Sequence, residues 1–181
     1  MHRIDLPDWA VERGKGYNTF DRIDPARTAF VVVDMQSVFV AEDEVFGNEH
    51  ARDVMAPINL LAKAMRDAGA RVIWTRQTVG DAPYVAMPEW QYDMSDPFVL
   101  RAVKALQAGA DSQGIHPAMA KGHDDLVLDK FRYGAFSCPA GALAKVLELH
   151  GIEMLVLVGT LTNVCVESTA REGNMRGYKV I

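Results

Sequence analysis

The fold of this chain is decided by the stretch Val156-Leu157-Val158-Gly159-Thr160-Leu161-Thr162-Asn163-Val164-Cys165-Val166-Glu167. In it, an apolar and partly β-branched run ends in a glycine and a polar turn, after which a helix-compatible segment begins. This order predicts a strand, a loop and a helix, with the thiol of Cys165 on the first helical turn. The free N–H groups and the dipole at a helix N-terminus favour the thiolate, the form that attacks carbonyl carbon. A buried, inert cysteine is the alternative, because free cysteines are among the most buried residues.

Segments typical of strands and of helices alternate along the rest of the chain. Short apolar runs predict strands over residues 29–34, 71–75, 125–131, 154–158 and 178–181. Apolar residues at helical spacing predict helices over residues 57–68, 99–106, 140–150 and 166–175. Alternation of this kind implies crossover connections. We therefore expect an α/β fold, with one three-layer α/β/α domain over residues 1–181 and a mainly parallel, open, Rossmann-like sheet.

Two parts of the chain depart from this regular pattern. The last predicted strand stops at Ile181 with no helix after it, so we expect either a short edge strand or a chain that is truncated at its C-terminal end. The irregular segment 78–117 holds several prolines and aromatic residues and encloses the predicted helix over 99–106. Long loops of this kind often carry function, so we expect this segment to supply a lid and specificity contacts.

The composition excludes several classes of partner. The chain has 181 residues, of which 49% are apolar and 24% charged, and its net charge is −5. This charge offers no general attraction to nucleic acid or to anionic lipid, and no window approaches the ~20 apolar residues of a membrane span. Two cysteines form no disulfide framework, and the N-terminal residues lack the apolar stretch of a signal peptide. We therefore expect a cytoplasmic protein with a small-molecule substrate.

Three reactive side chains stand at the carboxyl ends of predicted strands. Asp34 closes the first strand, Lys130 lies near the end of the third, and Cys165 follows the fourth. Because ligands bind beyond these ends in an open parallel sheet, we expect the three side chains to meet there. An acid, an ammonium group and a thiol together form a nucleophilic constellation. Taken singly, Asp34 also suits a turn or a helix cap, and Lys130 a solvated cation.

The sequences around these residues resemble the signature blocks of a known family. The blocks are Phe30-Val31-Val32-Val33-Asp34-Met35-Gln36, Lys130-Phe131-Arg132-Tyr133-Gly134-Ala135-Phe136 and Gly159-Thr160-Leu161-Thr162-Asn163-Val164-Cys165-Val166-Glu167-Ser168-Thr169. In this order and at these separations they are similar to those of the isochorismatase-like cysteine hydrolases. The resemblance implies a catalytic triad of Asp34, Lys130 and Cys165, no cofactor, and a homo-oligomer. It also implies a cis peptide bond between Thr160 and Leu161, in the loop that receives the oxyanion.

The amino-acid sequence of the third block, residues 159–169, narrows the expected reaction. It is most similar to the branch that includes ureidoacrylate, biuret and N-carbamoyl amidohydrolases. The resemblance therefore implies hydrolysis of a non-peptide C–N bond in a small amide, ureido or carbamoyl compound, through a thioester on Cys165. Two alternatives stay open. One is an isochorismatase-type vinyl-ether hydrolase in which Asp34 acts alone, and the other is a non-catalytic binding or oligomerising homologue.

We expect no metal at this site. Nicotinamidases of the family carry an Asp-x-His metal motif after the second strand, whereas this chain reads Thr75-Arg76-Gln77-Thr78 there. The histidines of the middle segment, His116 and His123, lack a matched ligand spacing.

The candidate substrate contacts lie in or near the same blocks. They are Gln36, Phe39, Arg76 and Tyr133. Arg76 or Arg132 could clamp a substrate carboxylate with paired hydrogen bonds, although a solvated or structural arginine is the alternative for both. Phe39, Trp74 and Tyr133 could line an apolar wall, although core packing explains Trp74 equally well. Cys138 lies in a Ser-Cys-Pro turn, and we expect it to be structural.

Overall fold

The described residues form one parallel sheet that is covered on both faces. The computed structural model describes residues 5–15, 17, 19–86 and 89–181. Its five-stranded sheet has the order β3-β2-β1-β4-β5, and every neighbouring pair is parallel. The strands are β1 (Thr28–Val33), β2 (Arg71–Gln77), β3 (Leu126–Lys130), β4 (Met154–Gly159) and β5 (Lys179–Val180). The expected α/β fold with a parallel open sheet is thus confirmed.

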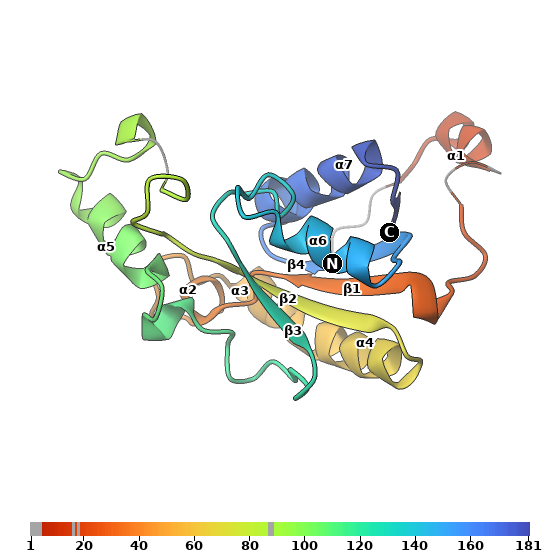
Figure 1. The fold of residues 1–181 in the computed structure, drawn as a ribbon, viewed down its shortest axis with the longest axis horizontal. Helices are drawn as coiled ribbons and strands as arrows, with labels where there is room; N and C mark the ends of the chain where they lie inside the picture. Colours follow the sequence, from red (N-terminus) through yellow and green to blue (C-terminus); the bar gives the residue numbers. More distant parts are fainter. Residues whose placement is uncertain (1–4, 16, 18, 87–88) are drawn as a thin grey trace.

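Helices form the two outer layers of this sheet. In Figure 1, α4 (Met55–Asp67) lies on one face, and α6 (Ala142–Leu149) and α7 (Glu167–Met175) lie on the other. The helix α5 (Pro97–Leu106) lies beyond the carboxyl ends of the strands, near α2 (Ser37–Val40) and α3 (Glu49–Asp53) (Figure 1). The N-terminal helix α1 (Asp8–Gly14) stands apart from these layers and has no buried residue.

The alternation of side chains along β1 builds a separate core on each face of the sheet. Every residue of this strand is buried. Phe30 and Val32 pack with Ile58, Ala62 and Met65 of α4, which recur at helical spacing. On the other face, Ala29, Val31 and Val33 pack with Leu143 and Leu147 of α6. A strand buried on both faces reads as a continuous apolar run, which explains why β1 shows no polar alternation.

The structure shifts several of the predicted boundaries. The second strand continues to Gln77, two residues beyond its predicted end. The helix predicted from residue 166 is preceded by a π-helical turn, η4 (Thr162–Val166), and this turn rather than α7 carries Cys165. The short helices α1, α2 and α3 were not predicted, because they are too short for an apolar period to stand out.

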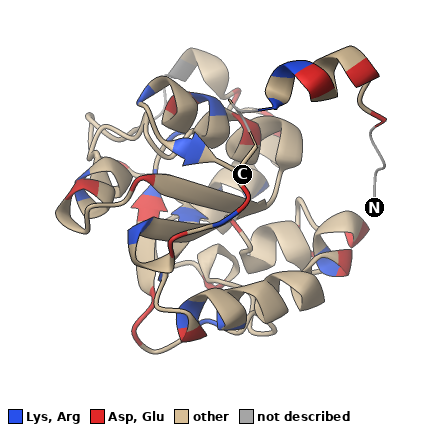
Figure 2. Cartoon of the chain, turned by 90° about the vertical axis from the view of Figure 1, so that its right-hand side faces the viewer, with Lys and Arg blue, Asp and Glu red and all other residues tan. Residues whose placement is uncertain are grey.

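Charge is spread rather than gathered in the view of Figure 2. Basic and acidic residues lie interspersed over helices, loops and strands, while β1 and β4 carry neither. Among the described residues, no helix combines the length and apolar character that crossing a bilayer requires.

Candidate active site

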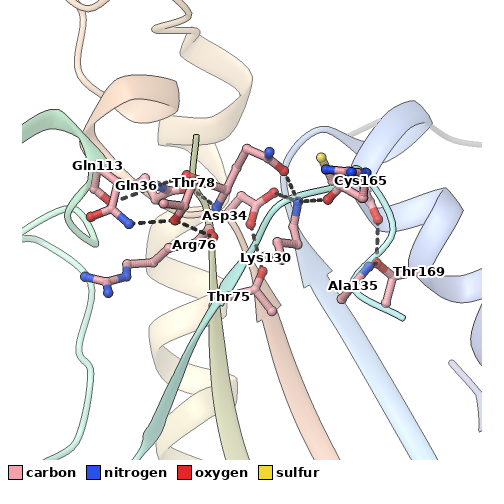
Figure 3. Close-up of polar contacts among 12 residues, drawn as sticks. Asp34, Gln36, Thr75, Arg76, Thr78, Gln113, Lys130, Ala135, Cys165 and Thr169 are labelled. Carbon is pink, nitrogen blue, oxygen red and sulfur yellow. Dashed lines mark hydrogen bonds and ion pairs between the residues drawn. The ribbon is translucent and has the colours of Figure 1, made fainter. Parts of the chain in front are cut away.

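Asp34, Lys130 and Cys165 converge where the order of the strands reverses. The chain continues from β1 to β2 on one side, and β4 lies on the other side of β1. Asp34 directly follows β1, and Cys165 lies in η4, which follows β4. Lys130 reaches from the end of β3 across β2 to the same point (Figure 3). Such a switch point is where open α/β sheets bind their ligands.

Asp34 is held by the backbone and by two neighbours. Its φ of 51° lies in the left-handed region, which Asp tolerates better than most residues. Thr75 donates a hydrogen bond to Oδ1 at 2.7 Å, and Lys130 Nζ lies 2.7 Å from Oδ2. The side chain is fully buried, and among the described residues Oδ2 accepts no well-directed hydrogen bond. A lone pair on this oxygen is therefore left for a proton.

Lys130 stays charged although it is buried. Its ammonium group donates to Gln77 Oε1 at 2.6 Å and to the Arg132 carbonyl at 3.1 Å, in addition to the ion pair with Asp34. Burial lowers the pKa of Lys130, but the Asp34 carboxylate and Cys165 outweigh this effect and raise it above its ordinary value. The site thus contains a cation whose charge Asp34 balances.

Cys165 is a thiol in this environment, which corrects one expectation from the sequence. The pKa of Cys165 is raised to about 12, chiefly by burial and further by the Asp34 charge, while Lys130 opposes the rise. The helix dipole was expected to favour the thiolate. The residue lies in the turn before α7, however, with a side chain that is almost fully enclosed and next to a carboxylate. Desolvation and like charge dominate there, so a base must remove the proton during the reaction.

Thr169 ties the cysteine to the loop that follows Lys130. Its hydroxyl donates to the Cys165 carbonyl at 2.7 Å and accepts from the Ala135 amide at 3.1 Å (Figure 3). The side chain is completely buried. One hydroxyl therefore fixes the distance between the segments that carry the thiol and the ammonium group.

The loop before Cys165 has the backbone form that the resemblance implied. The peptide bond between Thr160 and Leu161 is cis. The Thr160 amide donates to the Val33 carbonyl at 2.9 Å, and the Val166 amide donates to the Leu161 carbonyl at 3.2 Å. Within the described part of the chain, the Leu161 amide itself donates no hydrogen bond. It is thus available to a ligand.

Cys165 opens into a cavity of about 240 Å³. Four aromatic side chains line it: Phe39, Phe46, Tyr92 and Tyr133. Aliphatic side chains complete most of the remaining wall: Val79, Val103, Leu106, Leu161 and Val164. The cavity is therefore a small, largely apolar chamber with the thiol at its wall.

The predicted substrate contacts divide into two groups. Phe39 and Tyr133 line the cavity as expected. Gln36 does not, because it is fully buried and its amide bonds the Gln77 backbone and the Gln113 carbonyl. Arg76 does not line it either. It pairs with Asp129 at 2.8 Å and is directed away from Cys165 (Figure 3). Both residues support the strand ends rather than facing a ligand.

Two further residues from the sequence prediction have hydrogen-bond partners, and a third is buried. Trp74 is a core residue, and its indole N–H donates to Asp125 at 2.8 Å. Arg132 donates to the carbonyls of Val85, Ala86 and Phe131. Cys138 is buried, and it does not line the cavity.

Several residues of the site were not predicted from the sequence as site residues. Thr75 and Gln77 contact Asp34 and Lys130, yet both stood at or beyond the predicted end of the second strand. Strand alternation could have identified them, because residues two apart share one face and Arg76 between them faces the other. The segment 78–117, which we expected to supply specificity contacts, contributes Val79, Tyr92, Val103 and Leu106 to the cavity. Which of its residues face the cavity depends on how α5 packs, which is a tertiary contact.

Metal ligands do not gather at this site. Among the described residues, no group of three His, Cys, Asp or Glu side chains is placed to hold a metal ion. His123 is almost fully exposed and contacts Asp124, and His116 Nδ1 accepts from the Ala118 amide.

Comparison with known proteins identifies the family. The model of the isochorismatase domain matches residues 28–181. The chain belongs to the isochorismatase-like cysteine hydrolase family. It is similar to ureidoacrylate amidohydrolase RutB of Klebsiella pneumoniae strain 342, at 33% identity over 176 residues, which cover 85% of this chain and 70% of that protein. The RutB of Methylobacterium radiotolerans is 32% identical, over 86% of this chain and 65% of that protein.

Solved structures give the same result for the fold. A cysteine hydrolase from Pseudomonas syringae pv. phaseolicola 1448A superposes with a TM-score of 0.76 at 33% identity, covering 87% of this chain and 70% of that one. An N-carbamoylsarcosine amidase from Thermoplasma acidophilum has a TM-score of 0.69 at 23% identity, covering 85% and 79%. The chain spans 65–70% of the length of the curated relatives above. This isochorismatase-like hydrolase thus shares the family fold over most of its own length.

Proposed function

We propose that this isochorismatase-like hydrolase is a cysteine amidohydrolase that cleaves a non-peptide C–N bond in a small amide, ureido or carbamoyl compound. One observation carries the proposal: the Cys165 thiol lies next to the buried Asp34–Lys130 pair and opens into a cavity. A thiol, a base and a cation at one ligand site are the groups that acyl transfer to sulfur requires.

In the first step Asp34 accepts the Cys165 proton as the sulfur attacks the carbonyl carbon. With the thiol pKa at about 12, the proton leaves during the attack rather than before it. Asp34 Oδ2 has a lone pair for this proton, and Lys130 stabilises the negative charge of the cluster. The amides of Leu161 and Cys165 receive the oxyanion in our mechanism, a contribution of about 3 kcal/mol per donor in comparable sites.

In the second step the tetrahedral intermediate collapses and the C–N bond breaks. Asp34 returns its proton to the leaving nitrogen, which departs as ammonia or an amine and leaves an acyl or carbamoyl thioester on Cys165. Asp34 then takes a proton from water as the water oxygen attacks the thioester carbon, and the C–S bond breaks to release the acid or carbamic acid. The Cys165 thiolate takes the proton back from Asp34, which regenerates both the thiol and the carboxylate. The names of two relatives, ureidoacrylate amidohydrolase and N-carbamoylsarcosine amidase, support a carbamoyl C–N bond as the site of cleavage.

Ammonia release over a panel of compounds tests the proposal. The panel contains nicotinamide, biuret, N-carbamoyl amino acids, ureidoacrylate-like compounds and simple primary amides. We expect the wild type to release ammonia from at least one of them, and Cys165→Ala to release none while its circular dichroism stays unchanged. Full activity of Cys165→Ala would refute the mechanism. Vinyl-ether cleavage without ammonia would favour the alternative in which Asp34 acts alone, and no turnover of any compound would favour a binding role.

The expected homo-oligomer and cytoplasmic location stay predictions. Size-exclusion chromatography with light scattering tests the first, and fractionation of the source cells tests the second.

A further inference from the structure

The cavity at Cys165 carries no charged wall. None of the described residues that line it is an Asp, Glu, Lys or Arg. The polar residues that line it are Gln77, Tyr92, Tyr133 and Cys165, none of which belongs to a charged residue type. Burial raises the pKa of Tyr92, and the nearby Tyr133 adds to this rise, so its hydroxyl stays protonated. A ligand in the cavity therefore meets apolar surface and a few neutral hydrogen-bonding groups.

Three cations at the carboxyl ends of the strands have partners of their own. Lys130 is buried and pairs with Asp34. Arg76 pairs with Asp129 and is directed away from Cys165 (Figure 3). Arg132 lies close enough to influence Tyr92, but its guanidinium donates to the carbonyls of Val85, Ala86 and Phe131. Among the described residues, the cavity wall thus offers a substrate carboxylate no cation to pair with.

A buried charge without a partner is strongly disfavoured, whereas a buried methyl group is favoured. We propose that this hydrolase acts on small amides or ureas whose remaining part is uncharged and apolar, and that it discriminates against carboxylate-bearing ones. The inference rests on the proposed C–N hydrolysis for its chemistry, but the selectivity comes from the cavity wall alone. In particular, α5 contributes the apolar side chains of Val103 and Leu106 to this wall.

Three amides that differ only at the far end test the selectivity. Hexanamide ends in a methyl group, adipamate in a carboxylate and 6-aminohexanamide in an ammonium group. We expect hexanamide to have a kcat/KM about 100-fold or more above both charged compounds, from the cost of an unpaired charge in an apolar site. Equal or higher kcat/KM for adipamate would overturn the inference while leaving C–N hydrolysis intact.

Calorimetric titration of the same compounds separates the two proposals. Heat of binding from hexanamide and none from adipamate would support the selective cavity even if no ammonia is released, in which case only the proposed function fails. Tighter binding of adipamate would overturn the inference, and its loss in Arg132→Gln would identify Arg132 as the cation.

A variant with a cation in the cavity wall should shift the selectivity toward the carboxylate, and a neutral variant at the same position is its control. Val103 is half-buried on a short outer helix, so Val103→Arg places a cation in the wall without opening the core. We expect this variant to raise the adipamate-to-hexanamide ratio of kcat/KM by about 10-fold or more relative to wild type. Val103→Met, which alters the same position without charge, should leave the ratio unchanged. Equal ratios in all three proteins would contradict a selectivity that comes from the wall.

Discussion

Lys130 Nζ lies 2.7 Å from Asp34 Oδ2, and both side chains are buried at the switch point of the sheet. The pair joins β3 to β1 across β2, which contributes Thr75 and Gln77 to the same cluster. Each charge is tolerated because the other is present. The pair therefore holds the site together and supplies both the base and the cation that we propose for the reaction.

The pair should be sensitive to the loss of one partner. Lys130→Met leaves the Asp34 carboxylate buried without a counter-charge, and we expect a loss of about 3–5 kcal/mol in the free energy of unfolding. The double variant Asp34→Asn/Lys130→Met should recover much of this stability and none of the activity. Urea denaturation and ammonia release measure the two effects. Additive losses in the double variant would contradict a direct interaction.

The raised pKa of the Cys165 thiol predicts its reactivity. Since burial and Asp34 hold this pKa at about 12, the thiolate fraction should rise about tenfold per pH unit throughout the range from pH 7 to 10. Iodoacetamide labelling, in a Cys138→Ala background and followed by mass spectrometry, should show the same increase. A plateau below pH 8 would mean that the free enzyme holds a thiolate.

The same shift predicts a loss of stability in alkali. The unfolded chain releases the Cys165 proton near pH 8.5, whereas the folded chain retains it up to about pH 12. This contribution to stability is complete below pH 8.5 and is lost as the pH rises toward 12, by about 1.4 kcal/mol per unit. Urea denaturation at pH 8, 9 and 10 should show a steeper decline for wild type than for Cys165→Ala. Parallel curves would argue against the shift.

Thr169 should act as a positioning residue. Thr169→Val keeps the shape of the side chain but leaves the Ala135 amide and the Cys165 carbonyl without their partner, at a cost of about 1–3 kcal/mol. We expect kcat to fall more than KM changes, because Cys165 loses its fixed position. Thr169→Ser retains the hydroxyl and should restore kcat. If Thr169→Ser does not restore kcat, Thr169 contributes through packing rather than through its hydrogen bonds.

Gly159 should tolerate no side chain. Its φ is +117°, and a Cβ there would lie 2.1 Å from the Val33 carbonyl oxygen, so Gly159→Ala must push β4 away from β1. We expect a loss of about 4 kcal/mol or more, or failure to fold. Gly177→Ala is the matched control, because its φ is +91° but nothing lies near its Cβ, and it should lose about 1–2 kcal/mol. Similar losses for both variants would show that the positive φ, rather than the close approach of Val33, determines the cost at Gly159.

The sequence by itself determined the architecture and the reactive residues. Unbroken apolar runs such as β1 indicate strands buried on both faces, and their alternation with helices requires a parallel sheet. Because the carboxyl ends of parallel strands lie at the same edge of a sheet, Asp34, Lys130 and Cys165 were expected at that edge. The structure brings them together there. These inferences succeed because they depend on periodicity and connectivity, which are local properties of the chain.

Only the tertiary structure decided how these residues behave. The direction of Arg76 and the burial of Gln36 depend on which face of a strand each side chain occupies, and both differ from expectation. The thiol pKa depends on desolvation by segments far apart in the chain, and it moves opposite to the helix-dipole prediction. The uncharged wall arises where α5 packs over the strand ends. Solvation and long-range packing are properties of the folded molecule, so no pattern along the sequence contains them.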